Sequence, residues 1–246
     1  MLTKAQEKLI KSLHRKKGRL QSGLCLVEGR KVIEAAGRAV EDVFTKQDSN
    51  NFDKLVTTES PQDMAATAQI PRFTTGEVLS SETVLLLDGV QDPGNVGAIF
   101  RLCQGFGATL VMVESADATS PKVIRSSVGS MFSVPWISIP RSKASDLIER
   151  APHEVLRLEA YVPPSDPFFE KNIDKKEEVY RGELGDVDLF TKKRPMMLIV
   201  GSEGRGIQLP VKAPSMAIEH DKALESLNVG HAVGIALQHR YRSAKN

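Results

Sequence analysis

The chain has 246 residues, of which 41% are hydrophobic and 26% are charged, a composition typical of a globular protein with a sizeable core. No apolar run approaches the roughly 20 residues of a membrane-spanning helix and no secretory signal opens the sequence, so we expect neither a membrane protein nor a secreted one. Two cysteines and five histidines without ligand-like spacing argue against a disulfide framework and a metal enzyme, and favour the reduced cytoplasm.

The formal net charge of +2 hides an uneven distribution. Residues 1–31 hold nine basic and two acidic residues, which leaves +7, whereas the rest holds 24 basic and 29 acidic residues, which leaves −5. A basic end on a near-neutral chain predicts a local contact with a polyanion. A solvated helix face explains these charges about equally well, and an amphipathic mitochondrial presequence is a third interpretation.

The first 75 residues alternate between helical and strand patterns. Residues 2–17 place apolar side chains at helical spacing, and Gly18 is expected to end that helix. The patterns that follow are a strand at 24–27, a helix at 29–37, a strand at 40–45 and a strand from residue 55. We therefore predict a small α/β domain over residues 1–75 and, from the Gly- and Ser-containing composition, a linker at 76–83.

The pattern changes from residue 84 onwards. A continuous apolar run at 84–87 is typical of a parallel strand that is covered on both faces. The elements expected after it are a helix through 99–102, a strand at 109–113, a helix at 122–130, strands at 134–139 and 196–200, and a helix from 226. The charged, Pro- and Gly-rich segment 163–194 is expected to be a long loop. We predict a second α/β domain over residues 84–246.

Three loops at strand ends, 88–101, 200–207 and 224–230, are candidates for ligand binding. In open parallel sheets, ligands bind outside the carboxyl ends of the strands. Neither glycine-rich loop has the residues of a nucleotide-triphosphate loop or of a dinucleotide fingerprint, so those two chemistries lack their defining residues. Tight turns would explain any one of the three loops by itself.

Taken in order, the three loops resemble the motifs of the SpoU, or TrmH-like, RNA 2′-O-ribose methyltransferases. Motif 1 is matched by Asn-Val-Gly-Ala-Ile-Phe-Arg at 95–101, motif 2 by 198–207 and motif 3 by 225–229. This resemblance covers about residues 80–246. The segments 15–19 and 26–29 resemble, less sharply, the small RNA-binding domain that precedes many members of the ribosomal-RNA branch of the family.

The resemblance implies a fold and a cofactor. The C-terminal, mostly parallel sheet with flanking helices would be tied in a trefoil knot, preceded by a small α/β RNA-binding domain. S-adenosylmethionine would be held mainly by main-chain groups of the knot loops, at positions that match Gly201, Ile218 and Leu227. The sequence departs from the family at 219–221, where Glu-His-Asp replaces the usual proline and apolar residue after Ile218.

The resemblance also implies the site residues. Arg101 matches the family's catalytic arginine, and its role as a base or as a stabiliser of phosphate or alkoxide charge stays open. Asn95 and Glu203 are assigned to organising Arg101 and the substrate. Ser226 and Asn228 are assigned to shaping the reaction pocket, with helix capping as the competing interpretation.

We therefore predict a cytoplasmic, S-adenosylmethionine-dependent 2′-O-methyltransferase that acts on ribosomal RNA of the large subunit, without a metal and away from membranes. A homodimer is implied, with Gly230 and Gly234 suited to close packing at its interface or, equally, within one chain. The residues expected to contact RNA are Arg15, Lys16, Lys17 and Arg19. The alternatives are transfer RNA as substrate, an RNA-binding protein that has lost methyl transfer, and location in an organelle of bacterial descent.

Overall fold

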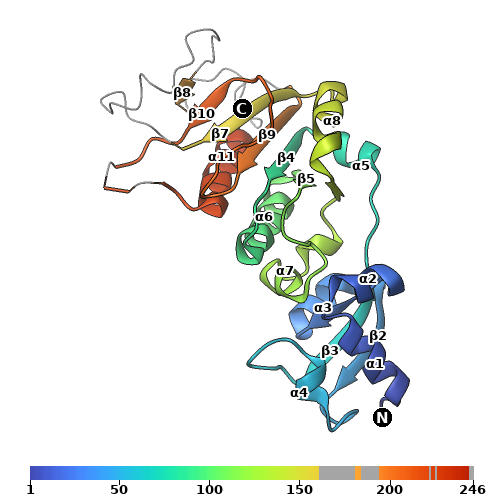
Figure 1. Ribbon diagram of the computed structural model, residues 1–246. Coiled ribbons are helices and arrows are strands. Elements are labelled where there is room, and N and C mark those ends of the chain that lie inside the picture. Colours follow the sequence, from blue (N-terminus) through green and yellow to red (C-terminus); the bar gives the residue numbers. More distant parts are fainter. Residues whose placement is uncertain (161–180, 184–193, 222, 225, 244–246) are drawn as a thin grey trace.

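Two β-sheets organise the chain in the computed structural model (Figure 1). The structure describes residues 1–160, 181–183, 194–221, 223–224 and 226–243. Most of the predicted loop at 163–194 lies outside these residues. Within them, no helix is long and apolar enough to cross a membrane.

The smaller sheet is antiparallel and has the strand order β1-β3-β2. Its strands are β1 (Leu24–Glu28), β2 (Val40–Thr45) and β3 (Met64–Gln69). The helices around it are α1 (Lys4–Ser12), α2 (Lys16–Ser22), α3 (Arg30–Ala36), the 3₁₀ helix η1 (Gly37–Ala39) and α4 (Phe52–Leu55). The predicted alternation of helices and strands in this part of the chain is therefore confirmed, although several boundaries differ.

Two predicted element boundaries in this region are wrong, and the expected linker contains a helix. The helix expected over 2–17 is divided into α1 and α2, and Gly18 lies inside α2, which ends instead at the left-handed Gly23 (φ 72°). The strand expected from residue 55 begins only at Met64, because Leu55 completes the short helix α4. The expected linker contains a helix, α5 (Thr75–Leu79), which begins at a capping box formed by Thr74 and Glu77.

The larger sheet is parallel throughout and has the order β6-β5-β4-β9-β7-β10-β8. Its strands are β4 (Thr83–Asp88), β5 (Thr109–Val113), β6 (Trp136–Ile139), β7 (Glu154–Glu159), β8 (Arg181–Glu183), β9 (Met196–Gly201) and β10 (Ser215–Ala217). Every residue of β4 is buried, as a strand covered on both faces requires. Strand β9 lies between β4 and β7, although both precede it in the sequence.

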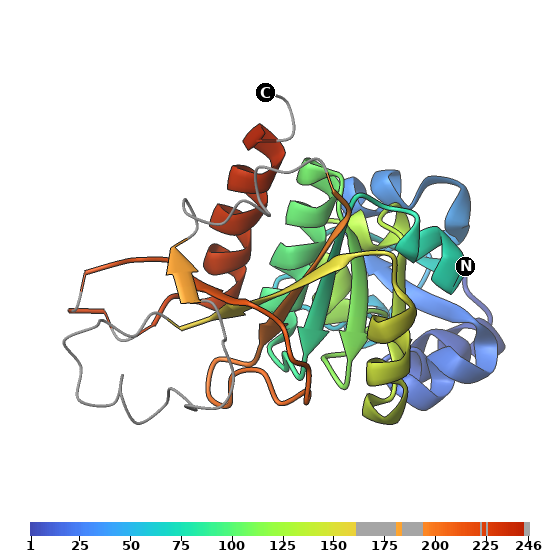
Figure 2. The ribbon, with the colours of Figure 1, turned by 90° about the horizontal axis from the view of Figure 1, so that it is seen from above.

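Helices cover both faces of this sheet. They are α6 (Pro93–Phe106), α7 (Pro121–Ser126), η2 (Ser130–Phe132), η3 (Arg141–Lys143), α8 (Ala144–Arg150) and α11 (Val229–Ser243). Figure 2 shows α6 and α11 side by side on one face. A Cβ added at Gly234 of α11 would lie 3.5 Å from the Leu102 side chain of α6, so this glycine packs against its own chain.

The two sheets meet at α7 (Figure 1). One hydrophobic cluster contains side chains from both sheets, Val27 of β1 and Leu85 of β4 among them, together with Ile124 of α7. Two ion pairs cross the same boundary. In the first, Arg19 Nη2 lies 2.6 Å from an Asp117 carboxylate oxygen. The other joins Arg125 of α7 to Glu28 of β1, with 2.5 Å between Nη1 and Oε2.

Candidate functional site

A cavity of about 400 Å³ opens where β9, β7 and β10 end. These strands are adjacent and parallel, so their carboxyl ends meet at one edge of the sheet, the usual place for a ligand in such folds. The residues that line it are Leu158–Ala160, Val200–Ile207, Ile218, His220, Ser226, Leu227, Val229 and Ala232. Its volume is within the range of small-molecule sites.

The three residues predicted to hold the cofactor all lie in this cavity. Gly201 ends β9, Ile218 follows β10, and Leu227 precedes α11. A Cβ added at Gly201 would overlap the backbone of Gly206 and Ile207, because the loop closes back on its own first residue. The wall of the cavity is thus close-packed main chain that only glycine at 201 permits.

Three polar side chains from the three motifs meet beside the cavity. Oε1 of Glu203 accepts hydrogen bonds from Nδ2 of Asn95 at 3.0 Å and from Nδ2 of Asn228 at 2.8 Å. The Asn228 Nδ2 group also lies 2.9 Å from Oδ1 of Asn95. One carboxylate therefore ties α6, the loop after β9 and the start of α11 together, although the residues are up to 133 positions apart in the sequence.

Asn228 also caps α11. Its Oδ1 accepts hydrogen bonds from the backbone N–H groups of Gly230 at 2.9 Å and His231 at 3.3 Å. Both interpretations of this residue are thus compatible with the structure, since Oδ1 serves the cap and Nδ2 serves the Glu203 contact. Ser226, by contrast, lines the cavity and has no hydrogen bond to the other described residues.

Arg101 lies apart from the cavity. It is exposed, forms no ion pair within the described part of the chain, and lines an open groove of about 1040 Å³ between α6 and α11. Asn95 and Asn228 line the same groove. Arg101 therefore shares the groove with Asn95 and Asn228, whereas Glu203 and Ser226 line the cavity.

The predicted RNA-contacting residues differ in exposure. Arg15, Lys16 and Lys17 are exposed at the start of α2. Arg19 is only 3% exposed, and its guanidinium donates to Asp117, to Thr119 and to the Leu13 carbonyl. The prediction that Arg19 is available to RNA is therefore wrong, because the side chain is used for an internal ion pair.

Neither cysteine is suited to nucleophilic chemistry. Burial raises the pKa of the Cys25 thiol to about 12, and burial raises the pKa of Cys103 as well. Both thiols are free and buried. In the described ranges, no group of three His, Cys, Asp or Glu side chains is arranged to hold a metal ion.

Several cavity residues are not among the predicted ones. Leu158, Glu159 and Ala160 reach the cavity because β7 lies next to β9. Residues 156–159 of β7 alternate apolar and charged side chains, which is a strand signal that the sequence contains and the prediction omits. His220 belongs to the segment that departs from the family pattern, and it too lines the cavity.

Comparisons of the sequence and of the structure with known proteins both find rRNA methyltransferases. The SpoU rRNA Methylase family matches residues 82–238. The chain is 26% identical to a 23S rRNA guanosine 2′-O-methyltransferase of Bacillus subtilis, over 93% of each protein. It is 33% identical to a 23S rRNA adenosine 2′-O-methyltransferase of Streptomyces laurentii, over 75% of this chain and 64% of that relative. An AdoMet-bound rRNA methyltransferase from Sinorhizobium meliloti shares the fold, with a TM-score of 0.79, 22% identity, and coverage of 98% of this chain and 96% of that one.

Proposed function

Because the chain belongs to the SpoU rRNA methylase family, we propose that it transfers a methyl group from S-adenosylmethionine to the 2′-hydroxyl of a ribose in ribosomal RNA. One observation carries the proposal: Asn95, Glu203 and Asn228, one from each motif, meet beside a cavity at the carboxyl edge of a parallel sheet. Relatives with 23S rRNA 2′-O-methyltransferase activity support ribosomal RNA as the substrate.

The cavity residues fit S-adenosylmethionine. Gly201, Ile218 and Leu227 would hold it, and the glycines of the loop that begins at Gly201 offer backbone groups with no side chain of their own. Two solved neighbours are described as bound to AdoMet. When bound, this cofactor supplies an electrophilic methyl group.

The protein's own residues position the reacting groups and neutralise negative charge on the RNA. Glu203 fixes Asn95 and Asn228, so that the amides at the edge of the cavity have defined orientations. The Arg101 guanidinium, in the groove it shares with these amides, is placed to bind an RNA phosphate and to stabilise developing negative charge on the ribose oxygen. Correct alignment of the reactants can account for several kcal/mol of the barrier.

We propose that residues 1–75 form the RNA-contacting domain and residues 84–246 the methyltransferase domain. Arg15, Lys16 and Lys17, exposed at the start of α2, are the proposed contacts. Electrostatic contact with phosphates would give binding that weakens as salt increases.

Three finer features remain part of the proposal. Insertion of β9 between β4 and β7, and of β10 between β7 and β8, supports the trefoil knot. A homodimer is supported by the open groove between α6 and α11, where Ile235 is 44% exposed. Bacterial relatives that modify ribosomal RNA support a cytoplasmic location.

Incubation of the purified protein with labelled S-adenosylmethionine and total RNA tests the reaction. We expect label in the large ribosomal RNA, at a ribose that resists alkaline cleavage. Label confined to transfer RNA would replace the substrate, and an absence of label in all RNA would contradict the enzymatic function.

A further inference from the structure

A buried carboxylate lies beneath the candidate site. Asp88, the last residue of β4, is 1% exposed. Its Oδ2 accepts hydrogen bonds from the backbone N–H groups of Gln208 at 2.5 Å and Leu209 at 2.8 Å. Its Oδ1 lies 2.6 Å from Nη2 of Arg141. A buried charge is costly unless it is paired and hydrogen-bonded, so Asp88 and these partners hold one another in place.

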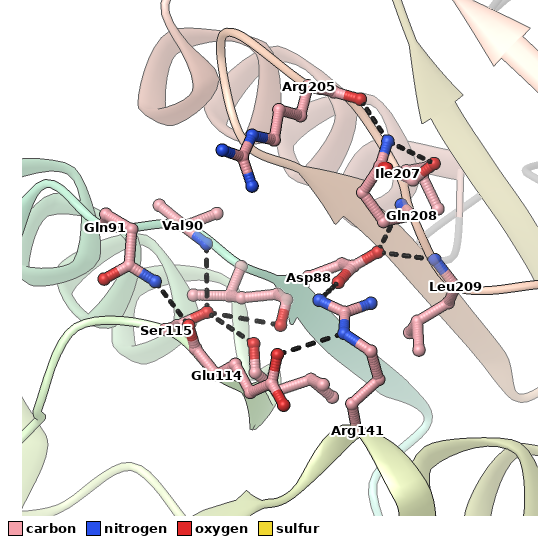
Figure 3. Close-up of polar contacts among 12 residues, drawn as sticks. Asp88, Val90, Gln91, Glu114, Ser115, Arg141, Arg205, Ile207, Gln208 and Leu209 are labelled. Atoms are coloured by element: carbon pink, nitrogen blue, oxygen red, sulfur yellow. Dashed lines mark hydrogen bonds and ion pairs between the residues drawn. The ribbon is translucent and has the colours of Figure 1, made fainter.

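The two amides belong to the loop that forms the cavity wall. Residues 201–207 line the cavity, and Gln208 and Leu209 follow directly. The loop is closed at its base by a hydrogen bond from the Gly206 N–H to the Ser202 carbonyl at 2.9 Å. Asp88 holds the far end of this loop against β4, yet it is not among the described residues that line the cavity. Figure 3 shows the carboxylate between the loop and Arg141.

Arg141 extends the same network to the first motif. Its Nε donates to Oε2 of Glu114 at 3.0 Å, and hydrogen bonds to Asp88 and Glu114 raise the pKa of Arg141 above its ordinary value, so the guanidinium stays charged. The Glu114 carbonyl accepts a hydrogen bond from the Gln91 side chain, in the loop that leads to Asn95 (Figure 3). Glu114 has a left-handed backbone (φ 46°), a conformation that is unfavourable for this residue and that the network maintains.

We propose that Asp88 and Arg141 are positioning residues for the methyl donor: through the Gln208 and Leu209 amides they fix the 201–209 loop in the shape that binds S-adenosylmethionine. This inference rests on the proposed function, since it concerns the same cavity. Neither side chain has to touch the cofactor. A small displacement of a binding loop is enough to impair affinity and alignment together.

The test compares three variants of the full chain. Asp88→Asn keeps the size of the side chain but removes its charge, and Arg141→Met removes the cation from a side chain that is 33% exposed and can be replaced with less risk to folding. Glu28→Gln is the matched control. It weakens another buried carboxylate–arginine pair, the one with Arg125, and neither of these residues lines the cavity. Calorimetry gives the Kd of S-adenosylmethionine, thermal unfolding gives Tm, and hydrogen exchange follows the peptide that contains residues 202–211.

We expect Asp88→Asn to raise the Kd of S-adenosylmethionine about tenfold and Arg141→Met to raise it less, as removal of charge-assisted hydrogen bonds predicts. Exchange at Gln208 and Leu209 would increase in both variants. Glu28→Gln is expected to lower Tm while leaving this Kd and this exchange unchanged, which separates positioning from general stability.

Each outcome decides a different question. If wild-type protein binds S-adenosylmethionine and both network variants bind it equally well, the positioning role is refuted. If Glu28→Gln weakens binding as much as they do, the effect is general destabilisation and the inference again fails. If Asp88→Asn does not fold, Arg141→Met decides by the same criteria. Wild-type protein that does not bind S-adenosylmethionine would instead contradict the proposed function.

Discussion

Asn228 uses two different atoms for two different purposes, and substitution can separate them. Oδ1 caps α11, whereas Nδ2 contacts Glu203. Asn228→Ser keeps a good capping oxygen on a shorter side chain that does not reach Glu203, and Asn228→Ala removes both functions. The pair of variants therefore tests whether the residue acts in the reaction or only begins a helix.

The magnitudes follow from the hydrogen bonds of the two atoms. Removal of the cap costs about 1 kcal/mol, so the alanine variant is expected to unfold about 3 °C below the serine variant for a chain of this size. A hydrogen bond to a charged partner contributes about 1.5–3 kcal/mol when buried, and we take about 1.4 kcal/mol because Asn228 and Glu203 are exposed, which corresponds to about a tenfold decrease in kcat/KM. Both variants should show this decrease equally.

The assay measures methyl transfer from labelled S-adenosylmethionine to ribosomal RNA beside thermal unfolding of the same samples. An equal decrease in activity with unequal stability is the expected pattern. Serine that restores wild-type activity would show that Asn228 acts only as a cap, and the Glu203 contact would then have no part in transfer.

Three other variants test the proposed roles of Arg101, of the exposed basic residues of α2 and of Gly201. Arg101→Ala is expected to lower methyl transfer about 100-fold while Tm and the Kd of S-adenosylmethionine stay unchanged, because the side chain is exposed and lies outside the cavity; equally impaired binding would contradict this. Replacement of Arg15, Lys16 and Lys17 by alanine should weaken RNA binding and its dependence on salt. The slope of log K against log salt concentration should decrease by about one for each phosphate that the protein no longer neutralises. An unchanged slope would mean that these residues form only a solvated helix face. Gly201→Ala should abolish S-adenosylmethionine binding in calorimetry, because the added Cβ overlaps the loop backbone; normal binding would refute the proposed position of the cofactor.

Arg19→Met is the control for the basic group. Its guanidinium is paired with Asp117, and the hydrogen bonds from Arg19 and Thr119 keep the pKa of that carboxyl low although burial opposes this. Removal of the arginine is expected to cost about 3 kcal/mol of stability and to leave the salt slope of RNA binding unchanged. A reduced slope would mean that Arg19 contacts RNA despite its burial.

The elements that the sequence predicts well have strong local signals. A continuous apolar run predicts β4. The start of α6 is predicted wrongly, because the helix begins at Pro93, capped by Asp92, inside the segment 88–101 that is expected to be a loop. The motifs likewise identify residues that the fold then brings together. Their contacts with Glu203 depend on the strand order, which local signals do not encode, since β9 is inserted between two earlier strands.

The sequence also does not show which basic residues are exposed. Lys17 and Arg19 look equivalent in the sequence, but residues two positions apart point to nearly opposite sides of a helix. One is exposed and the other is buried against Asp117, almost a hundred positions away. In the sequence, Asp88 is only the polar end of an apolar strand, because its role requires the amides of a loop 120 residues later.

Helix α7 links the basic end of the chain to the first motif. On one side, Arg125 pairs with Glu28. On the other, the Ser126 hydroxyl donates to the Pro93 carbonyl at 2.9 Å, and Gly97 allows α6 to approach so closely that an added Cβ would overlap Ser126. Since both contacts belong to one short helix within a shared hydrophobic core, the exposed basic residues of α2 have a defined position relative to the site. The +7 segment is therefore part of the same packed structure as the cavity. If the exposed residues of α2 contact RNA phosphates as proposed, their fixed distance from the cavity would determine which ribose reaches the methyl group.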